Sequence, residues 1–275
     1  MAKITAAEVN KLRKQTGAGM MDCKNALVEN DGDFEKAIDY LRKKGQKVAA
    51  KRSDRDAAEG CVLSGVNSDN SYGAVVMLNC ETDFVAKNDD FVAFTKSLLT
   101  AAIENKVQSK DALYAIIIDG RSIQDLVTDQ IGKIGEKLEI GGFGFIEGDF
   151  VQTYIHPGNR LATAVGMTKK LDNIEEISKD IAMQVAAMNP AGLNKESIPQ
   201  DVIDRELAIA KDVILQEGKP EHMVEKIAMG KLNKFFKENT LLSQAFIKNS
   251  KINVEEYMKE ADKKKTSPIG RACKE

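Results

Sequence analysis

Apolar residues recur at helical spacing in three short segments at the start of the chain. Thr5 and Glu8 form a capping box that begins a first helix, and the apolar face of this helix continues to Gly17. We expect a second helix over residues 20–29 and a third over residues 33–45, where a glycine ends the pattern. Three short helices in succession predict a small helical bundle.

A basic, weakly apolar stretch follows the third helix, from Lys43 to Arg55. Its charge and its lack of an apolar face favour a solvated linker. Contact with RNA through the same positive charges is the alternative, and salt-sensitive RNA binding would support it.

The pattern then changes to short runs rich in β-branched residues, which indicate strands. Two groups of strands are each followed by helical segments, and this order predicts an α+β core in two related parts with antiparallel sheets. The helices of the core begin at the capping residues Asn88, Ser122 and Asn173. The predicted strands are residues 61–66 and 72–80 in the first group, and 138–147, 150–156 and 161–168 in the second.

Beyond Pro199 two amphipathic helices follow each other, with a bend at residues 218–220. Each arm has one apolar stripe and much exposed charge, and the stripe of the second arm includes Phe235. This pattern is typical of an antiparallel coiled-coil hairpin that protrudes from the body of a protein. Residues 261–275 are charged, and we expect them to be loosely held.

These segments predict five regions along the chain. The regions are a three-helix domain with its basic linker (1–55), the N-terminal half of the core (56–140), the first part of the C-terminal half (141–199), the coiled-coil hairpin (200–239), and a return segment with the charged tail (240–275).

Composition narrows the class of protein. The 275 residues include 43% apolar residues, which is enough for a sizeable core, and the formal net charge of -2 gives no reason to expect a nucleic acid as the main partner. No apolar run approaches the roughly 20 residues that cross a bilayer, so we expect no membrane partner. Because the four cysteines lie far apart, we expect reduced thiols in a cytoplasmic protein: Cys23, Cys61, Cys80 and Cys273.

The sequence contains few of the motifs that are typical of enzymes. It lacks the GxxxxGK[ST] motif of a phosphate-binding loop, and Gly17-Ala18-Gly19 follows a helix and not a strand, which disfavours a nucleotide site there. His156 could act as a general base, but no second group near it completes a catalytic site. We therefore predict no catalytic residue, no cofactor and no metal site.

Residues 82–88 depart from the pattern expected of an exposed connection. They put a carboxylate beside a large aromatic between a strand and a helix. In one interpretation Asp83 caps a turn and Phe84 packs on the sheet. In the other, Phe84 is an exposed anchor for a partner's pocket and Asp83 steers or pairs beside it. Met20 and Met21 also allow two interpretations: they are core residues, or they form an adaptable contact surface.

Two long motifs carry a resemblance to a known family. Residues 12–27 (LRKQTGAGMMDCKNAL) and residues 79–88 (NCETDFVAKN) are similar to two signatures of the elongation factor Ts family and occur in the same order. Weaker similarities lie at residues 133–136, 154–156 and 242–246. The resemblance covers roughly residues 1 to 246.

The resemblance implies a ubiquitin-associated-like N-terminal bundle, a two-part core and a protruding hairpin. It also implies a guanine-nucleotide exchange factor that binds elongation factor Tu, at its GTPase domain and its C-terminal region, and promotes release of GDP by disturbing the magnesium and phosphate site. No covalent chemistry and no direct nucleic-acid contact are implied. The implied partner-binding residues are Arg13, Met20, Met21, Thr82, Asp83, Phe84, Val85, Ile134, Gly135 and His156.

Some alternatives stay open at this point. A bundle and a coiled coil could serve as an adaptor that binds its partner without changing GDP release. An enzyme that uses Asp83 or His156 is a second alternative, and a homodimer contact through the core or the coiled coil is a further option. The family's final strand has no visible counterpart in residues 263–275, so we expect no strand there.

Overall fold

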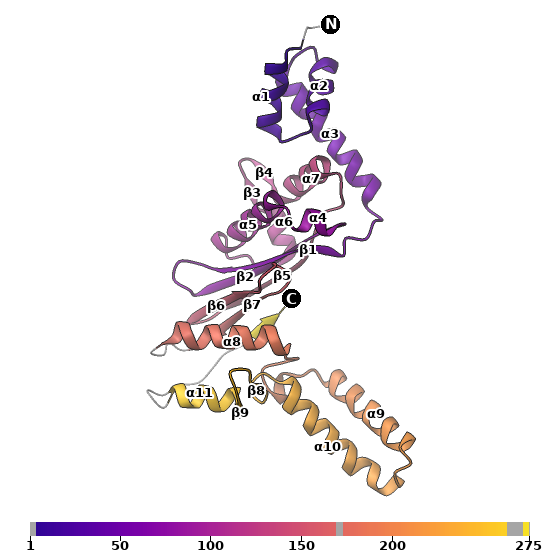
Figure 1. Cartoon of the computed structure of the whole chain (residues 1–275), viewed down its shortest axis with the longest axis vertical. Helices are drawn as coiled ribbons and strands as arrows, with labels where there is room; N and C mark the ends of the chain where they lie inside the picture. The colour runs from indigo at the N-terminus through magenta and orange to yellow at the C-terminus, as the bar shows by residue number, and fades with distance from the viewer. Residues whose placement is uncertain (1–3, 169–172, 263–271, 275) are drawn as a thin grey trace. The chain divides into compact units, whose positions relative to one another are not determined.

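The computed structural model describes residues 4–168, 173–262 and 272–274 of the chain (Figure 1). It is an α+β protein with antiparallel strand pairs, as the sequence predicts. The contacts divide the chain into two compact units. Unit 1 comprises Met1–Leu63, Val76–Phe143 and Gly158–Arg160, and unit 2 comprises Ser64–Val75, Gly144–Pro157 and Leu161–Glu275.

The N-terminal bundle of unit 1 contains α1 (Ala6–Thr16), α2 (Met20–Glu29) and α3 (Phe34–Arg52). The predicted capping box is present, because the backbone N–H of Thr5 donates to Oε2 of Glu8 at 2.7 Å while the N–H of Glu8 donates to Oγ1 of Thr5 at 3.3 Å. A small apolar core holds the three helices together. Its buried members are Val9, Leu12, Cys23, Ala26, Leu27 and Ala37.

The predicted end of the third helix at Gly45 is wrong, and so is the linker interpretation of most of residues 43–55. Helix α3 continues through Gly45 to Arg52, and the basic residues lie along this helix. Gly45 is buried where α3 crosses α7 (Ile123–Ile134), opposite Gly132. A Cβ atom on Gly132 would lie only 2.7 Å from the Cα of Gly45. Gly45 therefore marks a close helix–helix crossing and not the end of a helix.

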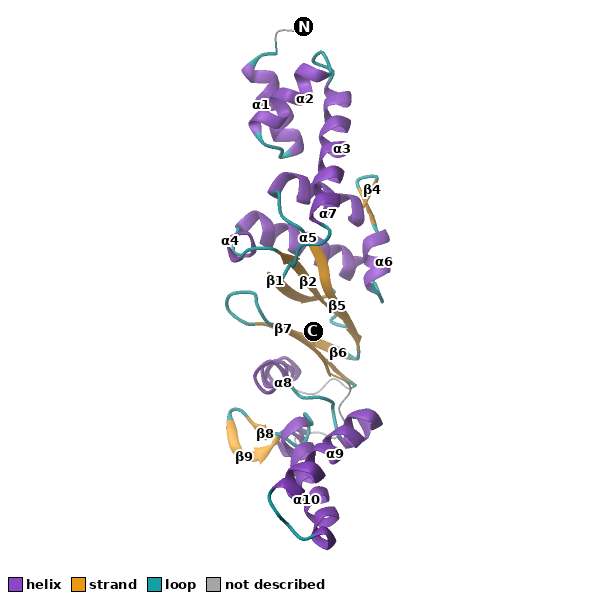
Figure 2. Ribbon diagram, turned by 90° about the vertical axis from the view of Figure 1, so that its right-hand side faces the viewer, coloured by secondary structure: helices purple, strands orange, loops and turns teal. Residues whose placement is uncertain are grey.

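The first sheet has the order β1-β2-β5 (Figure 2). Helices α4 to α7 lie between β2 and β5 in the chain. Asn88 caps α5 as predicted, with its side chain accepting from the N–H groups of Asp90 and Phe91, and Ser122 caps α7. The sequence did not predict α4, α6 or the two short strands β3 and β4. The bounds are β1 (Glu59–Val66), β2 (Tyr72–Cys80), α4 (Asp83–Ala86), α5 (Asp89–Glu104), α6 (Lys110–Ala115), β3 (Ile117–Ile118), β4 (Arg121–Ser122) and β5 (Glu139–Glu147).

Unit 2 contains a second sheet in which β6 (Phe150–Ile155) pairs antiparallel with β7 (Ala162–Met167). Helix α8 (Ile174–Met188) packs against both strands. Asn173 stands at the start of this helix, but it has a φ of 60° and its side chain makes no capping hydrogen bond with a described residue. The helix is held by its apolar face instead. The buried cluster includes Phe150, Val165, Met167, Ile177, Ile181, Ala182 and Val185.

The expectation that no strand forms near the C-terminus is wrong. Residues Ala272–Lys274 form β10, which pairs antiparallel with β7 in the register Ala272↔Val165. The second sheet therefore has the order β10-β7-β6. Three residues are too few to show a periodic pattern, and the pairing is made by backbone groups that every sequence carries. Residues 263–271 of the predicted loose tail lie outside the described part.

The predicted helical hairpin consists of α9 (Gln200–Gln216) and α10 (Glu221–Asn239). Two small buried clusters lie between its arms, and Phe236 is more deeply buried than the predicted Phe235. Backbone hydrogen bonds close its base, since Ala191 N–H donates to Asn239 O at 2.8 Å. The remaining elements of unit 2 are a 3-10 turn (Lys195–Ser197), β8 (Ala245–Phe246), β9 (Asn249–Asn253) and α11 (Val254–Asp262).

None of the helices in the described ranges is both long and apolar enough to pass through a membrane.

Candidate protein-contact site

The side chain of Phe84 projects into solvent from the short helix α4, immediately after β2. It is 84% exposed, which is the opposite of the packing of a core aromatic. The interpretation in which Phe84 packs on the sheet is therefore wrong. An exposed aromatic on a defined backbone is the arrangement that the anchor interpretation requires.

The turn that carries Phe84 is held from behind by the carboxylate of Glu136. Its Oε2 accepts from the backbone N–H groups of Glu81 and Thr82, each at 3.1 Å, and its Oε1 accepts from the hydroxyl of Thr82 at 2.7 Å. Oγ1 of Thr82 accepts in turn from the N–H of Val85 at 3.4 Å and caps α4. Hydrogen bonds to a charged acceptor are stronger than neutral ones, so the start of α4 is fixed.

A second carboxylate, that of Glu81, connects the same turn to the end of α3. Arg52 donates from Nη1 to both carboxylate oxygens at 2.7 and 2.9 Å, and the backbone N–H of Lys137 donates to Oε1 at 2.7 Å. The Lys137 hydrogen bond and then the Arg52 guanidinium hold the pKa of Glu81 below its ordinary value. The last turn of the helix from the N-terminal bundle is thereby joined to the turn that carries Phe84.

Asp83 lies beside Phe84 and forms an ion pair with Lys87, with Nζ 2.6 Å from Oδ2. This contact lowers the pKa of Asp83, so the carboxylate is charged at neutral pH. The pair lies at the surface and contributes little to folding. The part of Asp83 in steering or pairing with a partner stays a prediction.

Phe84 and Val85 line an open groove of about 610 Å³ together with Ile134 of α7. Gly135 follows directly and ends α7 in the left-handed conformation, with a φ of 79°. Gly17, which lies between α1 and α2, lines the same groove. The structure thus brings three predicted contact residues of the core together, and it places the α1–α2 corner of the bundle beside them.

The start of α2 exposes two methionines, Met20 at 53% and Met21 at 63%. Arg13, in the last turn of α1, is also exposed. The core interpretation of the two methionines is therefore wrong. Flexible, polarisable side chains on a helix surface suit contact with another protein.

His156 belongs to unit 2, where it lies at the end of β6. Its Nδ1 is 3.0 Å from the hydroxyl of Tyr154, and its backbone N–H donates to Leu161 O at 2.8 Å. Among the described residues no carboxylate or nucleophile is paired with this ring. The histidine is exposed at a strand end, as predicted, and its part in an interface stays a prediction.

Metal-binding side chains and thiols are the other groups of the described part that could take part in chemistry. No cluster of three or more metal-binding side chains occurs there. The cysteines whose side chains are described, Cys23, Cys61 and Cys80, are free and buried. Burial raises the pKa of Cys61, and burial together with the Glu136 charge raises the pKa of Cys80 to about 11, so both thiols stay protonated at neutral pH.

Sequence reasoning did not single out Arg52, Glu81 or Glu136, although the last two stand inside the quoted motifs. A carboxylate that accepts backbone hydrogen bonds across more than fifty residues looks like any surface acid in the sequence. The signal in the sequence concerned Glu81, which stands near Phe84 in the motif of residues 79–88.

The fold and this surface define an α+β protein that presents exposed apolar side chains on a hydrogen-bonded support. Comparisons with known proteins identify the family. Residues 81–271 match the family model described as Elongation factor TS. The chain is 55% identical to elongation factor Ts of Christiangramia forsetii and 53% identical to that of Flavobacterium psychrophilum, over 95% of both chains in each case. It is 42% identical to elongation factor Ts of Chloroherpeton thalassium, over 99% of this chain and 97% of the relative.

The chain belongs to the elongation factor Ts family. Membership of this family supports a role as a nucleotide exchange factor in translation elongation.

Proposed function

We propose that this protein binds elongation factor Tu in its GDP-bound state and promotes release of GDP, with Phe84 as the side chain that enters the partner. The observation that carries the proposal is the 84% exposure of Phe84 on a turn fixed by Glu81 and Glu136. An aromatic held in this way loses little conformational freedom on binding, so more of its burial appears as affinity.

The other proposed contacts surround this anchor or extend it. Thr82, Asp83 and Val85 lie on the same turn, and Ile134 and Gly135 end the neighbouring helix α7. Arg13, Met20 and Met21 would contact the partner's GTPase domain, and His156 would support the contact from unit 2. These assignments rest on the family resemblance of the motifs and on the exposure of the side chains.

The mechanism requires no covalent step by this chain. GDP in the partner is held through its phosphates and a magnesium ion, whose charge offsets theirs. A wedge that displaces elements around the magnesium site weakens these contacts, provided that the protein binds the empty partner more tightly than the GDP-bound one. Linkage makes the effect reciprocal, because fresh GTP weakens the grip of the exchange factor by the same factor. A hundredfold mutual weakening corresponds to about 2.7 kcal/mol.

The test is release of a fluorescent GDP analogue from purified elongation factor Tu, with this protein present in substoichiometric amounts. Acceleration of release by catalytic amounts supports exchange. Tight binding without acceleration would favour an adaptor, and absence of binding would overturn the proposal.

Substitution of the anchor sharpens this test. Because Phe84 buries little area in the free protein, we expect Phe84→Ala to leave the melting temperature nearly unchanged and to slow exchange more than about tenfold, as expected for loss of an interface hot spot. Ile117→Ala is a matched control, since Ile117 is 63% exposed in the same unit and does not line the groove. A folded Phe84→Ala variant with normal exchange would remove the wedge role.

A further inference from the structure

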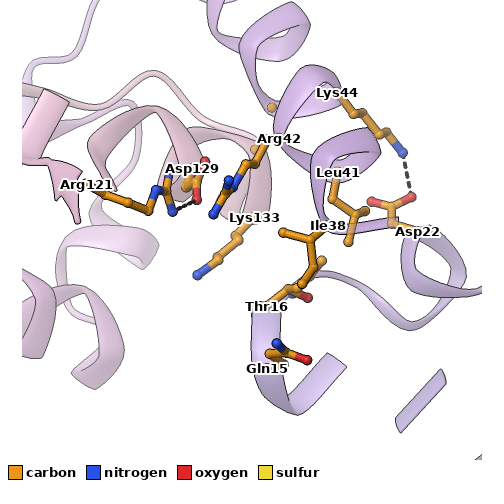
Figure 3. Close-up of a pocket in the computed structure, with 13 residues that line it drawn as sticks. Gln15, Thr16, Asp22, Ile38, Leu41, Arg42, Lys44, Arg121, Asp129 and Lys133 are labelled. Carbon is orange, nitrogen blue, oxygen red and sulfur yellow. Dashed lines mark hydrogen bonds and ion pairs between the residues drawn. The ribbon is translucent and has the colours of Figure 1, made fainter. Parts of the chain in front are cut away.

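A second hollow in unit 1 lies where α3 crosses α7 and shares Lys133 with the groove of Phe84 (Figure 3). Its volume is about 210 Å³. Ile38 and Leu41 of α3 form an apolar part of its wall, and the closely approaching backbones at Gly45 and Gly132 lie at the crossing. The charged side chains that line it are Asp22, Arg42, Lys44, Arg121, Asp129 and Lys133.

Both carboxylates in this lining are already neutralised by neighbours. Oδ1 of Asp22 lies 2.5 Å from Nζ of Lys44, and Oδ2 of Asp129 lies 2.5 Å from Nη1 of Arg121. Two of the four cations are thereby matched. The other two are left without a carboxylate from the lining, so the hollow carries an excess of positive charge.

Lys133 is the less satisfied of the two remaining cations. It forms no hydrogen bond or ion pair with any residue that the structure describes. Partial burial lowers its pKa, the Asp129 carboxylate opposes this shift, and the Arg121 guanidinium adds to it. A cation in this position gains from an anion that replaces lost hydration.

Arg42 of α3 lines the same hollow (Figure 3). Among the residues that the structure describes, its carboxylate contact is with Asp39, at 3.6 Å from Nη1, and Asp39 does not line the hollow. A guanidinium has five N–H donors, so this single long contact leaves donors free. Arg42 and Lys133 therefore offer a planar fork and a point charge from two different helices.

We propose that this hollow binds a small oxyanion of the phosphate class, with Arg42 and Lys133 as its principal ligands. The volume is below the roughly 300–1,000 Å³ of pockets that enclose a drug-sized molecule, which favours a phosphoryl or diphosphoryl group over a whole nucleotide. Guanidinium and ammonium groups are the side chains that bind such anions best. The anion would bridge α3 and α7, so its binding stabilises the packing of the N-terminal bundle on α7. This site does not depend on the exchange proposal.

Calorimetric titration of the full chain with pyrophosphate, at ionic strength held constant with sodium chloride, tests the proposal. We expect saturable binding at one site and a rise in melting temperature with pyrophosphate concentration. Arg42→Gln and Lys133→Gln should each weaken binding about tenfold, the effect of one charged hydrogen bond. Lys96→Gln, at an exposed lysine of α5 outside the hollow, should stay within about twofold of the unchanged protein, a difference of a few tenths of a kcal/mol.

Further measurements distinguish a free diphosphate from a nucleotide as the ligand, and they define the results that would refute the site. Equal affinity for inorganic pyrophosphate and for GDP identifies the diphosphate as the recognised group, and much tighter binding of GDP identifies a nucleotide. Absence of saturable binding at millimolar pyrophosphate overturns the proposal, as does equal binding by the two variants and the control. Arg42→Gln is the decisive variant, because Lys133 also lines the groove of Phe84. If Arg42→Gln weakens only the binding of elongation factor Tu, the hollow receives an acidic side chain of that partner and the anion site is refuted.

Discussion

The exposed ring of Phe84 depends on carboxylates that lie behind it. Glu136 receives three hydrogen bonds from residues 81 and 82, and Glu81 receives three from Arg52 and Lys137. These bonds fix the direction of the residues that lead into α4. An anchor that is fixed before binding is more effective than one that must be ordered on contact.

Glu136→Gln should therefore disturb exchange more than folding. An amide is neutral and offers one acceptor oxygen where the carboxylate offers two, so all three donors lose a charged partner and at least one loses its acceptor. We expect maximal exchange at saturating elongation factor Tu to fall about threefold to tenfold, the range for loss of one charge-assisted hydrogen bond. The measurement is a titration of exchange rate against partner concentration, beside a melting curve. Glu104→Gln, at an exposed acid at the end of α5, is the control. A loss of melting temperature with normal maximal exchange would assign Glu136 a purely structural role.

Glu81 leads to a prediction on pH. Its folded-state pKa is lowered from the ordinary value of 4.5, so the folded state binds its proton less readily than the unfolded state does. The stabilisation is fully present above pH 4.5 and is lost as the pH falls below that value through the folded-state pKa. In Glu81→Gln the side chain cannot titrate, so the urea midpoint should fall less between pH 7 and pH 3.5 than it does for the unchanged protein. The same fall in both proteins would show that the contacts of Glu81 do not contribute.

At the scale of elements, the sequence predicted those segments whose stability comes from local pattern. The capping box at Thr5, the cap at Ser122 and the hairpin arms all follow from residues close in the chain. The failures involve partners far away in sequence. The sequence indicated a helix end at Gly45 because glycine disfavours helix, whereas the structure has this residue inside α3, where it packs against Gly132 of α7. The domain boundaries drawn from the sequence remain a prediction.

In the candidate site, too, the sequence predicted the local features and missed those that depend on distant residues. The motif around Phe84 marked an exposed connection correctly, because an aromatic beside an acid after a strand is unusual within a loop. The sequence could not choose between burial and exposure of the ring, since that choice is made by what α4 packs against. Nor could it pair Glu136 with Thr82, because hydrogen bonds between segments 54 residues apart have no periodic signature.

The helix crossing gives an asymmetric prediction. A Cβ atom on Gly132 would meet the Cα of Gly45 at 2.7 Å, whereas a Cβ atom on Gly45 would find its nearest neighbours at 3.6 Å. Gly132→Ala should lower the free energy of unfolding by about 1–2 kcal/mol, because overpacking outweighs the gain in helix propensity. Gly45→Ala should leave it unchanged or raise it by up to about 1 kcal/mol. Urea unfolding of both variants checks this, and equal effects would mean that the helices cross less closely.

The whole molecule combines parts of unequal stability. In unit 2, α8 buries Ile177, Ile181 and Val185 in a cluster that extends to β7 and α11. The outer half of the α9–α10 hairpin has a smaller cluster, whose buried members are Ala210, Ile214, Val224 and Ala228. Two ion pairs between the arms, Lys211–Glu225 at 2.7 Å and Lys231–Glu217 at 3.4 Å, lie at the surface and add little.

Hydrogen exchange should reveal this difference. Local opening requires only the loss of the small cluster, so we expect amides in residues 209–229 to exchange at least about tenfold faster than those in the middle of α8. The hairpin also exposes apolar side chains that the free protein leaves uncovered, among them Ile209, Leu215, Met223 and Met229. If the hairpin contacts the C-terminal region of elongation factor Tu, addition of that partner should slow exchange in residues 209–229. The tip residues of the β3–β4 hairpin, which the proposed contact does not include, serve as the internal control. Slowed exchange in α4 with none in the hairpin would limit the contact to unit 1, and the hairpin would then have no part in binding this partner.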